Sequence, residues 1–419
     1  MSDFTDVRAR YESIRADQEA FYRELHEHPE LSHQETRTAD EVARRLTAWG
    51  YDVTTGIGGT GVVGVRVNGD GPTVLMRADM DALPVREATG VAYASTVVVT
   101  DAAGQSVPVM HACGHDVHVT CLLGAARLLA ESADAWRGTV VALFQPAEEA
   151  GDGARGMVDD GLMTRIPHPD VALAQHVLAM RAGRVATRPG AVFSAAESIR
   201  VRVFGRGGHG SMPQKTVDPV VLASAIVVRL QTVVAREIAP DEPAVLTVGS
   251  IHAGSKSNII PDEAVLEINT RSYTDATRQL LRTAIERIVR AECAASGSPR
   301  EPEFEVYDAF PPTVNDPAAT ARVADAFAAW FGDQAGELPL QTASEDFSDI
   351  PRALGVPYTY WGIGGVDAAT WDAAVASGTV ASDIPANHSP LFLPVVQPTL
   401  QTGTEALLAA AGAWLAPTA

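Results

Sequence analysis

The fold is decided by TVLMRADM at residues 73–80, an apolar strand that ends in acidic residues. It is followed by a buried helix, VHVTCLLGAARLLAES at 117–132, and by two apolar strands, TVVALFQ at 139–145 and VALAQHV at 171–177. Strands that alternate with helices in this way are typical of an α/β domain. We therefore predict a mainly parallel, mixed sheet flanked by helices.

The pattern changes at ESIRVRVFG, residues 197–205, where apolar residues alternate with arginines. This alternation predicts a half-solvated strand of an antiparallel sheet. Asp218 and Pro219 then predict the start of a helix, with Asp as N-cap and Pro at the first helical position. Strands at 244–254 and 263–273, a helix at 275–296 and a strand at 303–310 follow, so the order is β-α-β-β-α-β, a ferredoxin-like unit.

The length of 419 residues favours two domains, since a single core stops growing at roughly 250–300 residues. After the second unit the α/β pattern resumes, with a strand at PYTYWGIGG and a C-terminal helix ending near Trp414. We predict one domain from residues 1–190 and 312–419, with residues 191–311 inserted into it. Helices are expected at 5–29 and 36–50.

Composition excludes several classes of function. The formal net charge of −20 repels polyanions, so neither nucleic acid nor an anionic membrane surface is an expected partner. The odd and sparse count of three cysteines argues against a disulfide framework, and the lack of a CxxC pair excludes a zinc ribbon. No uninterrupted run of about 18 apolar residues predicts a membrane span. The charged N-terminus lacks a signal-peptide core, which predicts a cytoplasmic protein.

The strongest chemical signal is MHACGHD at residues 110–116. Cys113 and His115, two residues apart at a turn before a helix, offer a thiolate and an imidazole to one ion. Zinc and related first-row metals accept that mixture. The alternative is that Cys113 is an ordinary buried cysteine of the core.

Further ligands follow other strands and loops. Glu148 and Glu149 come directly after one strand, where open α/β sheets place their sites, and the alternative is a solvated acidic loop. His176 ends the next strand and could equally be a core histidine. Asp79 and Asp81 follow another strand, with turn capping as their alternative. His388 lies in a C-terminal loop without a local signal. One cysteine, three histidines and a glutamate suffice for two metals that share a ligand and keep open positions.

The inserted unit carries three candidate residues of its own. His209 lies in the glycine-rich GRGGHG at 205–210, where the backbone can approach a ligand closely. Asn258 and Arg271 could hold a substrate carbonyl and carboxylate, although a surface salt bridge would also explain Arg271. The same GRGGHG and GDGARG at 151–156 match a dinucleotide-binding pattern, but neither lies in the required strand–helix unit.

The chain resembles the M20 metallopeptidase family, in its amidohydrolase branch of hippurate hydrolases, N-acyl amino acid amidohydrolases and auxin-conjugate hydrolases. The segments that carry the resemblance span nearly the whole chain. They are FYRELHEHPELSHQET, RADMDALP, MHACGHDVH, QPAEE, AQHV, GRGGHGSMP, SNIIPD, SEDFS and NHSP. HACGHD together with PAEE is the most specific part.

The resemblance implies a metal-binding catalytic domain and an inserted lid that also forms a homodimer. It implies that Cys113 bridges two divalent metals, with His115 and His176 on one and Glu149 and His388 on the other. Zinc or manganese are expected, with cobalt and nickel as alternatives. By the same resemblance Glu148 is the general base and Asp81 orients a ligand. His209, from the partner subunit, would stabilise the oxyanion, and Asn258 and Arg271 would bind substrate.

The expected reaction is hydrolysis of the amide bond of an N-acyl amino acid or a related conjugate by a metal-activated water. A hydrolase with Cys113 as nucleophile is an alternative, but it leaves Glu149, His176 and His388 unexplained. A non-catalytic small-molecule-binding homologue would bind ligand without metal. A nucleotide-dependent oxidoreductase has only the glycine patterns in its favour.

Overall fold

The computed structural model describes residues 3–101 and 103–416. The chain forms two compact units: unit 1 is Met1–Gly190, Val314–Pro339 and Asp346–Ala419, and unit 2 is Ala191–Thr313 and Leu340–Glu345. Residues 340–345 group with unit 2 because their backbone bonds to its first residues, with Ser194 N–H donating to Ala343 O at 2.8 Å. Such a contact spans about 150 residues of chain, so no local pattern predicts it.

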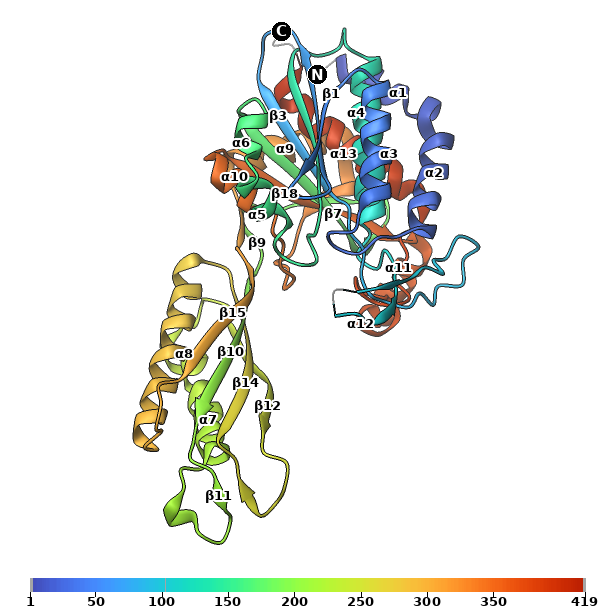
Figure 1. The fold of residues 1–419 in the computed structure, drawn as a ribbon. Coiled ribbons are helices and arrows are strands. Elements are labelled where there is room, and N and C mark those ends of the chain that lie inside the picture. The colour runs from blue at the N-terminus through green and yellow to red at the C-terminus, as the bar shows by residue number, and fades with distance from the viewer. Residues whose placement is uncertain (1–2, 102, 417–419) are drawn as a thin grey trace. The chain divides into compact units, whose positions relative to one another are not determined.

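Unit 1 is built on an eight-stranded sheet (Figure 1). Its strands, in spatial order, are β1 (Asp52–Ile57), β2 (Gly61–Asn68), β6 (Gly138–Gln145), β3 (Thr73–Asp79), β7 (Val171–Arg181), β18 (Tyr358–Val366), β8 (Val185–Thr187) and β17 (Ala335–Glu337). The four central strands, β6, β3, β7 and β18, run parallel. β1 is antiparallel to β2, β2 to β6, and β8 to β18, whereas the edge strand β17 pairs with β8 in parallel. The predicted α/β class with a mainly parallel, mixed sheet is confirmed.

Helices cover this sheet, and α4 and α13 pack against its central strands β3 and β7. The helices of unit 1 are α1 (Asp3–Ala9), α2 (Tyr11–Glu27), α3 (Thr36–Ala48), α4 (His115–Glu131), α5 (Gly153–Asp159), α6 (Leu162–Arg165), α9 (Pro317–Phe331), α10 (Asp349–Leu354), α11 (Ala368–Ser377), α12 (Val380–Asp383) and α13 (Val396–Leu415). A short hairpin of β4 (Val98–Thr100) and β5 (Ser106–Pro108) completes the unit. The single helix predicted over 5–29 is wrong, because α1 and α2 are separate helices on either side of Arg10.

Helix α4 is apolar on nearly every side, and almost all its residues are buried. A helix with that pattern belongs in the middle of a core rather than on a surface. Its first residue is His115, so the buried helix fixes the position of a predicted ligand.

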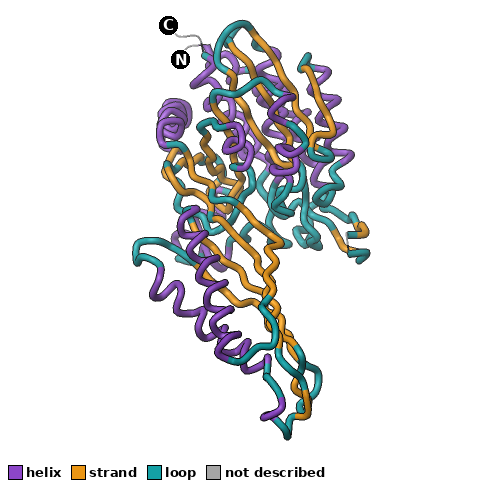
Figure 2. Tube along the Cα trace, turned by 60° about the vertical axis from the view of Figure 1, so that its left-hand side comes forward, coloured by secondary structure: helices purple, strands orange, loops and turns teal. Residues whose placement is uncertain are grey.

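Apart from the two-residue strands β11 and β13, which pair with each other, unit 2 has the predicted order β-α-β-β-α-β. Its elements are β10 (Ala195–Phe204), β11 (Gly208–His209), α7 (Pro219–Glu237), β12 (Val245–Ala253), β13 (Ile259–Ile260), β14 (Glu263–Ser272), α8 (Asp275–Ala295) and β15 (Glu303–Phe310), with β9 (Gly190–Phe193) and β16 (Thr313–Asn315) at its boundaries. The antiparallel sheet has the order β12-β14-β10-β15, and α7 and α8 cover one of its faces (Figures 1 and 2).

Local chemistry explains this unit. Ile199, Val201 and Val203 of β10 are buried under the two helices, whereas Arg200 points away and forms ion pairs with glutamates on both neighbouring strands. The Asp218 side chain accepts the Val220 N–H at 2.9 Å, which confirms the predicted cap. Helix α7 is long and apolar enough to cross a membrane, but one side of it forms the core of unit 2.

Candidate metal centre

The centre lies where neighbouring strands of unit 1 end. β3 and β6 are parallel partners in register from Thr73 opposite Thr139 to Asp79 opposite Gln145. The residues that follow the two strands, Asp81 on one and Glu148 on the other, therefore leave the sheet at the same edge. The Glu149 N–H donates to Asp81 Oδ2 at 2.9 Å, which joins the two segments.

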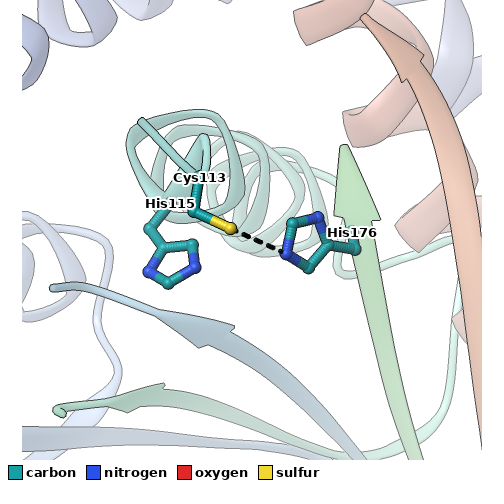
Figure 3. Close-up of side chains that lie close together, drawn as sticks. All are labelled: Cys113, His115 and His176. Atoms are coloured by element: carbon teal, nitrogen blue, oxygen red, sulfur yellow. Dashed lines mark hydrogen bonds between the residues drawn. The ribbon is translucent and has the colours of Figure 1, made fainter. Parts of the chain in front are cut away.

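A glycine turn presents the cysteine and the first histidine. Gly114 has φ 85°, in the left-handed region, and a β-carbon there would meet Val177 Cγ1 at 2.3 Å. Only glycine therefore allows the turn. Cys113 and His115 lie on either side of it, and His176 faces them from β7, with its Nε2 at 3.4 Å from Cys113 Sγ (Figure 3).

Two groups of potential metal ligands share Cys113. The ligand atoms of Cys113, His115 and His176 lie within 4.8 Å of one another, and so do those of Cys113, Glu149 and His388. The structure thus brings together all five residues that the sequence suggested as ligands. A shared thiolate between two sets of N and O donors is the donor chemistry of a two-metal site.

The hydrogen bonds of His115 fit a metal ligand. Its Nδ1 lies 3.2 Å from Asp81 Oδ1, and its buried Nε2 has no hydrogen-bond partner among the described residues. A carboxylate that holds the far nitrogen of a ligating imidazole fixes its tautomer and orientation. An orphaned nitrogen in a buried site is costly, and a cation would satisfy it.

Both ring nitrogens of His118, in contrast, form hydrogen bonds within the protein. Its Nδ1 lies 2.5 Å from Asp79 Oδ1, and its Nε2 accepts the Val177 N–H at 2.9 Å. His176 donates from Nδ1 to the Val177 carbonyl at 2.8 Å, which leaves its Nε2 as the basic nitrogen facing Cys113. His118 is therefore structural, although its position three residues after His115, on the same side of α4, would also suit a metal ligand.

The loop of His388 is held by its neighbour, which the sequence did not single out. The Asn387 amide donates to the carbonyls of Cys113 at 3.2 Å and Val177 at 3.1 Å, and the His388 N–H donates to Ala112 O at 2.8 Å. These bonds tie a C-terminal loop to the cysteine turn and to β7. The only local signal was the position of Asn387 before His388 in the segment NHSP.

A buried network of charged and polar side chains, which the sequence did not predict, lies next to the proposed metal ligands. Arg77 on β3 donates to Asp79 Oδ2 at 2.7 Å and to the Gln145 side chain at 2.9 Å. Burial alone would raise the pKa of Asp79, but the charge of Arg77, followed by those of His115 and His118, holds it well below its usual range. Asp79 is thus an anion that orients His118 beneath the centre.

The acidity of Cys113 argues against a thiol nucleophile. Burial, followed by the charge of Glu149, raises the pKa of this thiol, whereas a catalytic thiolate needs a lowered pKa. Hydrogen bonding with Cys113 and then Glu149 raises the pKa of His388 to about 10. The groups that raise the pKa of His388, Cys113 and Glu149, would likewise attract a divalent cation.

The candidate residues of unit 2 lie in two places. The Ser211 backbone N–H donates to His209 Nδ1 at 3.1 Å, which makes Nε2 the protonated nitrogen of the neutral, exposed ring. Asn258 lies beside it, because its carbonyl accepts the Gly210 N–H at 2.9 Å. Arg271 lies opposite Ala196 at the other end of the sheet, where Nη1 donates to Ser344 Oγ at 2.7 Å.

His209 and Arg271 lie far apart within unit 2. Arg271 pairs with the second residue of β10, and the loop bearing His209 follows the last residue, Phe204. At about 3.4 Å per residue, these positions are roughly 27 Å apart along the strand. One small ligand cannot touch His209 and Arg271 of the same chain.

Comparison with known proteins agrees with this geometry. Residues 75–381 match the model of peptidase family M20/M25/M40. Thermostable carboxypeptidase 2 of Saccharolobus solfataricus is 40% identical over 72% of this chain and 75% of its own length. Hippurate hydrolase of Campylobacter jejuni is 36% identical over 82% of this chain and 86% of its own.

A solved structure extends the comparison to the whole fold. The Bacillus subtilis YXEP protein, a dinuclear metal-binding peptidase of the M20 family, superposes with a TM-score of 0.75 at 26% identity. The match covers 96% of this chain and 98% of that one. Both units of the present chain thus have counterparts in a protein that binds two metals.

Proposed function

The chain belongs to peptidase family M20/M25/M40, and we propose that this metal-dependent amidohydrolase cleaves N-acyl amino acids and related conjugates at a two-metal centre built on Cys113. The observation that carries the proposal is the pair of three-residue ligand groups that share this cysteine. Neither group needs a residue from unit 2. The metal centre is therefore a property of unit 1 alone.

The proposed ligands divide between the two groups. His115 and His176 would hold one cation, Glu149 and His388 the other, and Cys113 would bridge them. Zinc or manganese is the proposed metal, with cobalt and nickel as alternatives. Bound there, the cations would supply Lewis acidity and a water of lowered pKa.

Glu148 is the proposed general base. It is buried, 5% exposed, and its Oε2 lies 3.9 Å from His115 Nε2, the nitrogen that faces the centre. A carboxylate in that position can take a proton from the attacking water and pass it to the leaving amine. Asp81 would keep His115 oriented during these steps through its bond to Nδ1.

His209 is the proposed oxyanion donor. Because Ser211 holds Nδ1 as an acceptor, the neutral ring has a proton on Nε2 to donate to a carbonyl oxygen that gains charge. Asn258, beside it, would bind the same end of the substrate. Arg271 would bind the substrate carboxylate with its planar guanidinium.

We also propose that a homodimer brings these residues together. His209 and Arg271 of one chain lie at opposite ends of β10, whose paired residues span roughly 27 Å, so one substrate would meet them from two chains. Unit 2 offers a surface for pairing, since Val221 is 65% and Val228 72% exposed on the outer side of α7, and β12 is a free sheet edge bearing Val245 and Ile251. Exposed apolar patches and open edges invite such contacts. The proposed location is cytoplasmic.

The first experiment tests the bridge. Wild type should bind two metals per chain and lose activity on N-acetyl or N-benzoyl amino acids in EDTA. Cys113→Ala should lose both metals in elemental analysis, because one side chain touches both. Two tightly held metals in this variant would refute the bridging role, and EDTA-resistant turnover would favour a cysteine hydrolase.

The second experiment tests the borrowed histidine. Inactive His209→Ala and Glu148→Gln chains are mixed and allowed to exchange. Random exchange should restore roughly a quarter of wild-type activity, because each mixed dimer holds one complete site. As the control, wild type mixed equally with the double variant should fall to about a quarter if His209 acts in trans, and to about half if it acts in cis.

A further inference from the structure

The backbone beside Glu148 is held in a demanding conformation. Ala147 has φ 51°, in the left-handed region that residues with a β-carbon seldom adopt. Such a conformation persists only where surrounding contacts determine it. The direction in which the next side chain, Glu148, leaves the backbone depends on these contacts.

Glu35 supplies one of them from a distant part of the chain. Its carboxylate is fully buried, and Oε1 accepts the Ala147 N–H at 2.8 Å and the His33 N–H at 2.9 Å. Thr60 Oγ1 donates to Oε2 at 2.6 Å. The carboxylate is thus fixed from two sides while it holds the strained residue.

A second anchor lies on the other side of Glu148. The Glu149 N–H donates to Asp81 Oδ2 at 2.9 Å, and Ser32 Oγ donates to that same oxygen at 2.7 Å. The Ala82 N–H donates to the Glu30 carbonyl at 2.8 Å. Residues 30–35, within the segment PELSHQE, therefore fasten the loops that follow both β3 and β6.

We propose that Glu35 is a positioning residue that fixes Ala147 and thereby aims the Glu148 carboxylate. This inference rests on the proposed role of Glu148 as general base. Among the described residues, the hydrogen bonds of the Glu35 carboxylate go to two backbone amides and one hydroxyl, and none goes to a proposed metal ligand or to Glu148. Its effect is on geometry, and its loss should slow turnover rather than weaken binding.

The variants separate geometry from charge. Glu35→Ala leaves the Ala147 N–H without its acceptor, and Glu35→Asp keeps the charge but falls one methylene short. Glu35→Gln keeps an acceptor oxygen for both amides, and the Thr60 hydroxyl can turn to accept from the new amide. Glu405→Ala is the matched control, because Glu405 is also buried, 3% exposed, and its partners Arg8, Trp330 and Gln401 are not part of this loop.

Three measurements are made on each variant: kcat and KM, metal content, and hydrogen–deuterium exchange of the peptide containing Ala147, with and without metal. Glu35→Ala should keep two metals and an unchanged KM, exchange faster at Ala147, and lose kcat by roughly 10- to 100-fold, the cost of about 1 Å of misplacement. Glu35→Asp should behave similarly, and it replaces Glu35→Ala if that variant does not fold. Glu35→Gln and Glu405→Ala should keep wild-type kcat and exchange.

Unchanged exchange or unchanged kcat in Glu35→Ala or Glu35→Asp would overturn the proposal. So would a kcat loss that excess metal fully repairs, because Glu35 would then act on a ligand. Equal losses in Glu35→Gln would make the charge, not the positioned oxygen, the cause. Failure of the underlying function is recognised separately, by a Glu148→Gln variant that retains full kcat.

Discussion

His26 makes the stability of unit 1 depend on pH. It lies on α2 and is completely buried between two carboxylates, with Nδ1 2.7 Å from Asp116 Oδ2 and Nε2 3.2 Å from Glu87 Oε1. Asp116 directly follows the proposed ligand His115. The histidine therefore joins α2 to the first turn of α4, where the proposed metal ligand His115 lies.

The size of the effect follows from the pKa. Burial alone would lower the pKa of His26, but its hydrogen bonds with Asp116 and Glu87 raise it from 6.5 to about 9. At 1.36 kcal/mol per pKa unit, the charged form stabilises the folded state by about 3 kcal/mol. Because the folded pKa is the higher one, this contribution is complete below pH 6.5 and is lost as pH rises through about 9.

Thermal unfolding of wild type and His26→Gln between pH 6 and 9.5, both in EDTA, measures this contribution. For a unit of nearly 300 residues, 3 kcal/mol corresponds to roughly 5 °C in Tm. Wild type should exceed the variant by about that amount at pH 6, and the gap should close by pH 9.5. Chelation removes the separate pH dependence of metal binding.

A gap in Tm that stays constant across this pH range would refute the reasoning, because the variant would then differ in packing rather than in a titrating charge. A gap that widens with pH would mean that His26 is neutral in the folded protein at pH 6. Its two carboxylate neighbours would then have to hold the proton instead.

The remaining predictions concern the metal centre. Glu148→Gln should keep two metals by elemental analysis but lose kcat by about 10²–10⁴-fold, as expected for a general base, whereas Glu149→Gln should lose metal first; reversed phenotypes would reverse the two roles. Asp81→Asn should lower metal affinity by roughly 10- to 100-fold in calorimetric titration, because its amide cannot accept from both His115 and the Glu149 N–H; unchanged affinity would remove Asp81 from the support of the centre.

Much of the architecture could be predicted from the local pattern of apolar and polar residues. The apolar runs at β3, β6 and β7 predicted the parallel sheet, and the alternation of Ile199, Val201 and Val203 with arginines predicted the antiparallel one. These patterns are readable because burial on one or both faces of a strand constrains every residue in it. The break between α1 and α2 could not be predicted in this way. The buried apolar residues Val7, Tyr11 and Ile14 keep a helical spacing across Arg10, so the sequence pattern continues where the helix ends.

For the site, the sequence by itself determined the donor types, because a cysteine, histidines and glutamates at strand ends and loops have few joint uses besides metal binding. Tertiary structure alone decided which of them meet. HDVH offers two histidines, and only the bonds of His118 to Asp79 and Val177 remove it from the ligand set. Glu35 and Asn387 act through backbone amides and carbonyls more than 100 residues away. The residues next to them in the sequence do not indicate these contacts, because each partner is a backbone group that only the fold brings close.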